Sequence, residues 1–221
     1  MNFGYAATIR TDFPELAVEA LLVEGISAHM DVAAPVVRFQ QIARERLAKG
    51  SESDLPEIQA WRRAFARMGL KPTQYRCASE ALLRRFRKEG ALPGIHPLVD
   101  ICNAVSLAFA IPVAAIDMAK IVGQLEVRRA TGTETYEAFS GEIEHPDPEE
   151  IIYADDGGNA HARRWTNRQS GRSAIRGETA TALIVAEAMH SGGQEDVGRL
   201  IDALEPALIE AGARSLERRA F

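Results

Sequence analysis

The chain has 221 residues, of which 46% are hydrophobic and 26% are charged, and its formal net charge is −5. This length and composition allow one substantial hydrophobic core, or at most two small ones. No apolar run approaches the roughly 20 residues that cross a bilayer, and the N-terminus lacks the features of a signal peptide, so we expect neither. The two cysteines, Cys77 and Cys102, form no CxxC pair, which favours a reducing, cytoplasmic location.

The first part of the chain predicts strands followed by helices. Tyr5–Arg10 and Leu16–Ile26 are rich in apolar and β-branched residues and predict two strands. Val36–Ala48 has the apolar spacing of a helix, and a second helix is predicted to begin near Pro56, because proline is favoured in a first turn. Its apolar positions recur at helical spacing and are Ile58, Trp61, Phe65 and Met68.

Two further helices are predicted before the pattern changes. The first carries an apolar stripe around Leu82, Leu83 and Phe86 and ends at Gly90. The second begins at Pro97 and is stopped by Pro112, since proline is excluded from a helix interior. The predicted buried side of this second helix consists of Leu98, Ile101, Cys102, Val105 and Phe109.

Strands dominate the next stretch, and two helices close the chain. The predicted strands are Gln124–Arg129, Ile151–Tyr153, Arg163–Thr166 and Ser173–Ile175. The predicted helices are Thr179–Met189, which is rich in alanine, and Gln194–Ala211, with Pro206 inside it. The order shows no regular βαβ alternation, so we expect an α+β fold in one compact domain spanning 1–221.

Basic residues gather in two segments of this acidic chain. One runs from Arg62 to Lys88 with Glu80 as its only acid, and the other runs from Arg163 to Arg176 without any acid. Solvated helix and strand faces would explain most of these arginines, whereas a surface that contacts phosphates would explain their clustering. For the second interpretation the RNA-binding candidates are Arg62, Arg63, Arg67, Arg84, Arg85 and Arg172.

The sequence lacks the common signatures of nucleotide and zinc sites. Neither GxxxxGK[ST] nor GxGxxG occurs, so nothing predicts a phosphate-binding loop. The five histidines are scattered and form no HExxH motif. We therefore expect no cofactor and no metal ion.

Several ordered phrases resemble the B3/B4 domain of the phenylalanyl-tRNA synthetase β subunit. That domain has a phrase of the type VDxTNYV, then PLHAFD, then a strand ending in R-x-A. Here the chain reads LVDICNAV at 98–105, PVAAID at 112–117 and VRRA at 127–130, with the same spacing between the first two phrases. EIIYAD at 150–155 and ETAT at 178–181 resemble two later phrases of the family. The resemblance covers residues 60 to 190 approximately.

The resemblance implies a three-layer α+β sandwich of mixed sheets flanked by helices. It also implies a pocket that accepts the aminoacyl end of a mischarged tRNA and hydrolyses the ester, although nothing indicates a complete aminoacyl-tRNA ligase. Asn103 stands at the family's pocket asparagine, and Cys102 replaces the neighbouring threonine. Ala114 replaces the pocket histidine, and the acid that recognises a tyrosyl hydroxyl has no counterpart near Ser170.

The candidate substrate-binding residues are Asn103, Cys102, Ala114, Trp165, Arg168 and Ser170. No catalytic residue is identified. Arg168, Ser170 and Arg172 predict either an anion-binding loop or a surface hairpin. Trp165 either stacks on the terminal adenine or belongs to the core. We expect Asn103, Arg168 and Trp165 to share one cleft.

Three functions agree with these features. The first is hydrolysis of mischarged aminoacyl-tRNA in trans, for which the partner is the aminoacylated 3′ end of tRNA. The second is a non-catalytic module that binds tRNA or a free amino acid. The third is an accessory subunit that docks on a synthetase, and none of the three involves a membrane.

Overall fold

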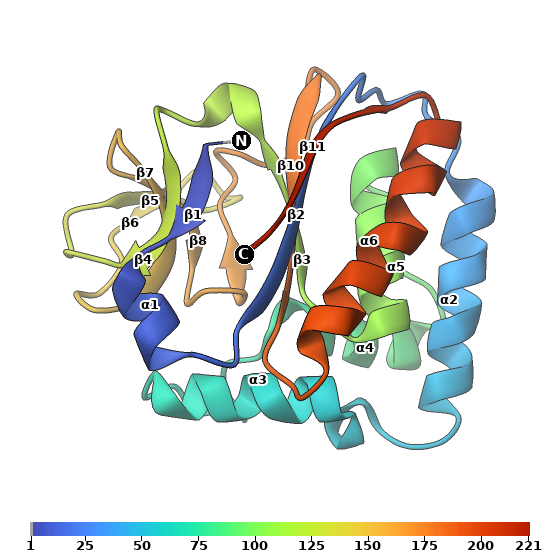
Figure 1. Cartoon of the computed structure of the whole chain (residues 1–221), viewed down its shortest axis with the longest axis horizontal. Helices are drawn as coiled ribbons and strands as arrows, with labels where there is room; N and C mark the ends of the chain where they lie inside the picture. Colours follow the sequence, from blue (N-terminus) through green and yellow to red (C-terminus); the bar gives the residue numbers. More distant parts are fainter. Residues whose placement is uncertain (1) are drawn as a thin grey trace.

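Two β-sheets and a layer of helices lie against one another in the computed structural model, which describes residues 2–221 (Figure 1). The seven-stranded sheet forms one outer layer, the four-stranded sheet lies in the middle, and helices cover its far face. This arrangement confirms the predicted α+β class with two sheets and flanking helices. Within residues 2–221, none of the helices has both the length and the apolar character needed to cross a membrane.

The middle sheet is antiparallel throughout. Its strand order is β11 (Arg214–Ala220), β2 (Ala17–Glu24), β10 (Thr181–Ala188) and β3 (Val113–Asp117). Helices α5 (Pro97–Phe109) and α6 (Gly193–Glu210) pack on one face of this sheet, and α2 (Ala33–Leu47) packs on α5. Their buried apolar side chains form the first part of the core.

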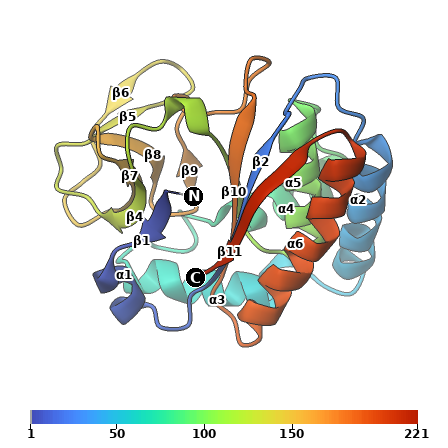
Figure 2. The same ribbon diagram turned by 45° about the horizontal axis from the view of Figure 1, so that its top comes forward.

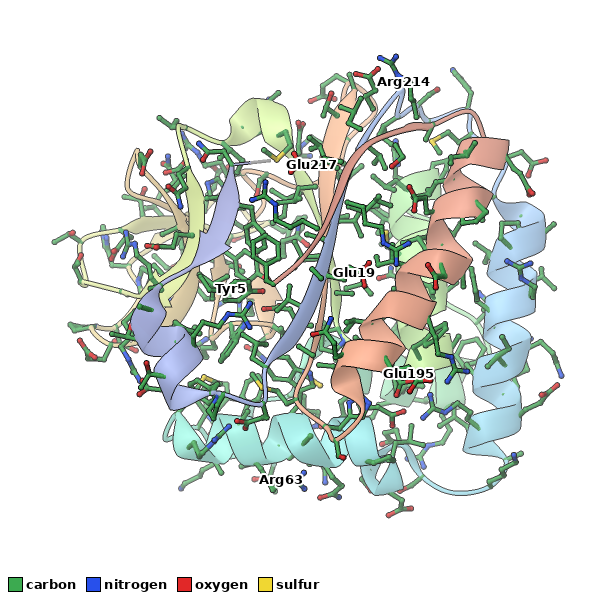
Figure 3. The ribbon with its side chains drawn as sticks, viewed as in Figure 1. Tyr5, Glu19, Arg63, Glu195, Arg214 and Glu217 are labelled. Atoms are coloured by element: carbon green, nitrogen blue, oxygen red, sulfur yellow. The ribbon has the colours of Figure 1, made fainter. Side chains whose placement is uncertain are left out.

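The outer sheet mixes parallel and antiparallel pairs. Its order is β1 (Phe3–Tyr5), β4 (Leu125–Arg129), β7 (Ile151–Asp155), β8 (Asn159–Arg163), β5 (Thr135–Glu137) and β6 (Ile143–Glu144), and β9 (Arg168–Gln169) pairs with β8. A second part of the core fills the space between this sheet and the middle one. Figure 3 shows Tyr5 of β1 within that space.

The remaining helices close the lower end of the molecule in the view of Figure 1. Helix α3 (Pro56–Arg67) runs beneath both sheets, as the turned view in Figure 2 also shows. Its Trp61 reaches the middle sheet, where the ring Nε1 donates to the carbonyl of Glu187 at 3.3 Å. Helix α4 (Ala78–Glu89) ends at Gly90, which has a positive φ of 78°. The short elements are α1 (Ala7–Asp12), η1 (Glu52–Asp54) and η2 (Met118–Lys120).

The structure confirms most of the predicted elements. The helices predicted over 36–48, from Pro56, around 82–86, from Pro97 and over 194–211 correspond to α2, α3, α4, α5 and α6. The strands predicted over 16–26, 124–129 and 151–153 correspond to β2, β4 and β7. The helices have one polar face and therefore a clear helical periodicity, whereas β2 and β7 are recognised by their apolar, branched residues.

Four predicted elements were wrong. Thr179–Met189 was predicted as a helix, but β10 occupies Thr181–Ala188 as a central strand whose faces are both covered, so its residues show no polar–apolar alternation. Tyr5–Arg10 was predicted as a strand, but the strand ends at Tyr5 and α1 follows. Arg163–Thr166 lies mostly in a turn, and Ser173–Ile175 lies in irregular structure.

Candidate functional site

Two cavities flank β3, the edge strand of the middle sheet. The first lies between the two sheets, has a volume of about 70 Å³, and is called here the inter-sheet cavity. The second lies between β3 and helix α5, has a volume of about 140 Å³, and is called the helix-side cavity. Both volumes exceed the roughly 10–15 Å³ that one water molecule needs. Strand β3 is therefore the wall between two separate spaces.

Alternation along β3 divides its side chains between the two cavities. Ala114 and Ile116 line the inter-sheet cavity, and Ala115 lines the helix-side cavity, since successive side chains of a strand point to opposite faces. Val113 and Gln169 line both. The Gln169 amide donates to the carbonyl oxygen of Ala115 at 2.7 Å, which fixes this side chain at the border.

The helix-side cavity is mostly apolar. Asn103 and Cys102 of α5 contribute to its wall, and the Asn103 amide has no hydrogen-bond partner within residues 2–221. Burial raises the pKa of the Cys102 thiol to about 12, so this sulfur is not a thiolate at neutral pH. The other lining residues are Ile95, Val99, Val113, Ala115, Phe139, Gln169, Ala174 and Ile175.

Trp165 forms a rigid wall of the inter-sheet cavity. Its side chain is fully buried, and its ring packs edge-on against Phe13 and Trp61. Trp165 and the preceding Arg164 both have positive φ angles, 58° and 48°, a conformation that side chains with a Cβ rarely adopt. The backbone N–H of Trp165 donates to the carbonyl of Ile151 at 2.7 Å, which holds the turn in place. Stacking of this ring on an adenine would require the core to open.

A buried carboxyl group, Glu187 of β10, lies in the same cavity. It accepts hydrogen bonds from the hydroxyls of Tyr5 and Tyr153, each at 2.6 Å, and from Nε1 of Trp165 at 2.7 Å. Burial raises the pKa of Glu187, and these hydrogen bonds lower it in part. Burial also raises the pKa values of Tyr5 and Tyr153. Through these hydrogen bonds, Glu187 links three elements to the middle sheet: β1, β7 and the turn after β8.

His161 of β8 is the second titratable group of the inter-sheet cavity. The register of β8 on β7 shifts so that Ala160 and Ala162 have partners, while His161 between them has none. A bulge of this kind redirects a side chain, and bulges occur often beside active sites. The imidazole is fully buried, and its Nε2 lies 3.1 Å from Oδ2 of Asp155. Its Nδ1 is buried and has no partner within residues 2–221.

Asp155 is held firmly as a carboxylate. It accepts from the backbone N–H groups of Val122 and Asn159 and from the Asn159 side chain. Burial raises its pKa, but these hydrogen bonds outweigh burial and bring the pKa to about 2. Burial lowers the pKa of His161, so the imidazole is neutral near pH 7. Because the carboxylate accepts at Nε2, the proton resides on Nε2 and Nδ1 carries a free lone pair.

The remaining substrate-binding candidates have structural partners. Arg168 lines the inter-sheet cavity, but Glu144 binds its guanidinium through two hydrogen bonds of 2.9 and 3.1 Å. Ser170 is fully buried; its hydroxyl donates to the carbonyl of Glu137 and accepts from the N–H of Arg172. The expected single cleft is not found, because Asn103 and Cys102 line one cavity and Ala114, Trp165 and Arg168 line the other.

The RNA-binding candidates divide into paired and free arginines. Four of them have acidic partners: Arg62 with Glu80, Arg67 with Glu15, Arg84 with Glu52 and Arg85 with Glu89. Three of those acids lie outside the basic segment 62–88, so the sequence of this segment alone overestimates the positive charge of the surface it forms. Arg63 and Arg172 are exposed, and their guanidinium groups have no partner within residues 2–221. Figure 3 shows Arg63 pointing away from α3.

One cluster away from the two cavities has the residue types of a metal site. Single ligand atoms of Glu57, His190 and Asp196 lie within 4.8 Å of one another. Arg46 already binds Glu57 at 2.6 Å, and His190 binds Asp196 at 2.9 Å. These contacts engage Oε1 of Glu57 and Nε2 of His190, while Oε2 of Glu57 and Nδ1 of His190 are buried without a partner within residues 2–221.

Sequence reasoning missed His161, Asp155 and Glu187. A signal was available for the first two, because Asp156, Gly157 and Gly158 are typical turn residues and a hairpin there brings Asp155 and His161 together from either side. No local signal marked Glu187, which reaches its partners only through the packing of two sheets.

Comparisons with known proteins assign the chain to a family. The model of the B3/4 domain matches residues 60–195. The chain is 33% identical over 112 residues to the phenylalanine–tRNA ligase beta subunit of Nitrobacter winogradskyi, an alignment that covers 51% of the chain and 13% of the relative. It is 28% identical over 87 residues to the same subunit of Shewanella oneidensis, covering 39% of the chain and 11% of the relative. The chain thus matches a small part of each relative's length.

A solved structure has a similar fold. The crystal structure of an N-terminal fragment of the phenylalanyl-tRNA synthetase beta subunit from Pyrococcus horikoshii superposes with a TM-score of 0.52. The superposition covers 97% of this chain and 50% of that one, at 11% sequence identity. At this identity the likeness concerns the fold alone.

Proposed function

The chain belongs to the B3/4 domain family, and from this membership we propose that it hydrolyses the ester bond of mischarged aminoacyl-tRNA in trans. The observation that carries the proposal is the pair of cavities that adjoin at Val113 and Gln169. The helix-side cavity offers an apolar space with a free amide, and the inter-sheet cavity offers polar groups that can act on a bond at the border. Hydrolysis of an aminoacyl ester requires recognition of the aminoacyl group as well as groups that promote cleavage.

The helix-side cavity suits the aminoacyl group. Its wall is apolar apart from the amides of Asn103 and Gln169, and no charged residue lines it. Asn103 is free to donate to the ester carbonyl or to orient a water molecule, since nothing within residues 2–221 occupies its amide. A donor aimed at developing negative charge on that oxygen would speed hydrolysis.

Contacts to the tRNA itself would come from cations that acids do not neutralise. Arg63 and Arg172 meet this condition within residues 2–221, whereas Arg62, Arg67, Arg84 and Arg85 would have to leave their acidic partners. Phosphate contacts of this kind give affinity that falls with salt and carries no sequence information. tRNA selectivity would therefore depend on the aminoacyl end.

We treat residues 1–221 as one functional unit in this proposal. The family match begins at residue 60, but β2 lies inside the middle sheet, between β11 and β10. Both β2 and β11 lie outside the matched range and still form part of the sheet that carries β3. A fragment limited to 60–195 would retain β3 but lack β2, the other neighbour of β10.

A panel of aminoacylated and misaminoacylated tRNAs in a single-turnover deacylation assay tests the proposal. The expected result is hydrolysis of at least one of them well above the rate in buffer. Asn103→Ala should slow that reaction by about 10²-fold while leaving tRNA affinity unchanged, because the amide acts on the ester and not on the phosphates. No deacylation above the buffer rate for any charged tRNA would eliminate the proposal.

A non-catalytic binding module is the second candidate. Ala114 stands where the resemblance places a pocket histidine, and its methyl group offers no proton acceptor to the inter-sheet cavity. This candidate predicts that an amino acid or tRNA raises the melting temperature without turnover. Docking on a synthetase, suggested by the names of the relatives, would appear as co-purification that survives ribonuclease.

A further inference from the structure

We propose that His161 and Asp155 form a catalytic dyad in the inter-sheet cavity, with His161 as the general base that activates water. The inference rests on the proposed hydrolytic function and names the groups that would perform the chemistry. The sequence resemblance assigns no role to either residue. The position, partners and burial of the two side chains point to this role.

The position of His161 is specific to the bulge in β8. A regular strand would pair residue 161 with β7 and would place neighbouring side chains on alternate faces. The register shift leaves His161 without a partner residue on β7, and its side chain lines the inter-sheet cavity together with Tyr153, Trp165 and Glu187. The adjacent turn holds Arg164 and Trp165 at positive φ, a conformation that is unfavourable for residues with a Cβ. Such strain is typical of functional sites.

The open Nδ1 points to a ligand because of its place. Buried polar atoms usually have a hydrogen-bond partner. Three histidines have a buried ring nitrogen without one within residues 2–221, and of these only His161 lines the inter-sheet cavity. The Nδ1 atom of His161 has none within residues 2–221, although the ring is fully buried. A water molecule in the adjoining cavity would satisfy Nδ1, and the cavity volume of about 70 Å³ is sufficient for it.

Asp155 acts as a positioning residue. It accepts from Nε2 of His161, so it fixes the tautomer with the lone pair on Nδ1. Four further hydrogen bonds, from Val122 and Asn159, hold the carboxylate in one orientation. When His161 takes up a proton, the ionised carboxylate at 3.1 Å stabilises the imidazolium.

The reaction balances with water as the only co-reactant. The water oxygen attacks the ester carbonyl carbon at the border of the cavities, and its proton passes to Nδ1 of His161. The tetrahedral intermediate then collapses, the bond between the acyl carbon and the ribose oxygen breaks, and the ribose oxygen takes the proton from Nδ1. The products are the free amino acid, as a carboxylate that releases one proton to solvent, and tRNA with a free hydroxyl.

Other charged groups around His161 act on its protonation. Asp155 of β7 favours the imidazolium, and Arg172, in the segment after β9, disfavours it. Tyr153, Glu187 and Arg168 line the same cavity, and Arg168 is neutralised by Glu144. Burial is the largest influence and lowers the pKa of His161 below its usual 6.5, which keeps Nδ1 unprotonated at neutral pH.

The test compares His161→Gln with His29→Gln in the single-turnover assay on the best tRNA substrate. Glutamine can still donate to Asp155 but carries no basic nitrogen, so the fold is retained and the base is lost. His29 is exposed, and its replacement controls for the loss of a histidine. We expect His161→Gln to slow hydrolysis by about 10²–10⁴-fold, the usual contribution of general base catalysis, and His29→Gln to leave the rate unchanged.

The pH profile separates catalysis from structure. The wild-type rate should rise with pH along a limb whose midpoint lies below pH 6.5, and this limb should be absent from His161→Gln. Imidazole added to His161→Gly should restore part of the lost rate. A wild-type protein that deacylates tRNA while His161→Gln retains its full rate and pH limb would overturn the dyad but leave the proposed function standing. Failure of wild type on every tRNA would overturn both.

Discussion

The two cavities on either face of β3 differ in what they contain. The helix-side cavity has one open amide, one inert thiol and otherwise apolar walls. The inter-sheet cavity contains a neutral histidine, a buried carboxyl group and a tryptophan in a strained turn. Under the proposed function, the first cavity would recognise the aminoacyl group and the second would supply the chemistry. A substrate at the rim of β3 would then reach both.

The largest expected effect concerns the wall of the inter-sheet cavity. Trp165→Ala should lower the free energy of unfolding by about 3–5 kcal/mol, because it removes a fully buried ring and leaves Glu187 without one donor. Urea denaturation measures the loss. Phe139→Ala is the matched control on the helix-side cavity; its side chain is 71% exposed, so the change should stay within about 0.5 kcal/mol. Equal losses for the two variants would contradict the contrast between a rigid and an open cavity.

The second prediction concerns Glu187 of the inter-sheet cavity and the pH dependence of the free energy of unfolding. Burial raises the pKa of Glu187 in the folded state above its usual 4.5. A raised pKa means that folding favours the protonated form, so the contribution is complete below pH 4.5 and is lost as the pH rises through the folded-state value. The free energy of unfolding of wild type relative to Glu187→Gln should therefore decrease with rising pH across this window.

Urea titrations of both proteins from pH 4 to pH 8 measure this difference. A difference that stays constant over the range would show that Glu187 ionises normally, with the three donors compensating burial completely. A difference that increases with pH would mean that the hydrogen bonds from Tyr5, Tyr153 and Trp165 dominate over burial. Either result would contradict the raised pKa of Glu187 on which this prediction rests.

The helix-side cavity was easier to predict from the sequence than its neighbour. Helix α5 has Pro97 at its start and a clear apolar side, so Cys102 and Asn103 could be placed on one helix beside a strand. The inter-sheet cavity depends on a central strand, β10, whose residues are buried on both faces and gave a helical prediction. With β10 misassigned, the place of Glu187 could not be predicted.

The position of His161 depends on a finer feature. A bulge changes the register by one residue, and no property of the residues Ala160, His161 and Ala162 indicates which of them lacks a partner. Most of the strand predicted at 163–166 is instead part of the turn that contains Trp165. The register of β8 and the conformation of this turn are tertiary properties, because packing against the middle sheet and the hydrogen bonds to Glu187 fix them.

The smallest expected effect concerns Cys102, which lies beside Asn103, the residue proposed to contact the ester. Burial raises the pKa of this thiol to about 12, so a negligible fraction is thiolate at pH 8, and the thiolate is the reactive form. Cys102→Ala should therefore change the deacylation rate by no more than about threefold. Iodoacetamide should modify neither Cys102 nor Cys77, whose pKa burial raises to about 11, until the protein unfolds.

Mass spectrometry after alkylation in native and denaturing buffer checks both thiols in one experiment, with Cys77 as the internal control in the core between the sheets. Rapid alkylation of Cys102 alone, with loss of activity, would show that the helix-side cavity holds a nucleophile. The ester would then be cleaved in the helix-side cavity, beside Asn103. The role of His161 would be limited to its hydrogen bond with Asp155. Because His161→Gln preserves that bond, the rates of the two variants decide on which face of β3 the ester is cleaved.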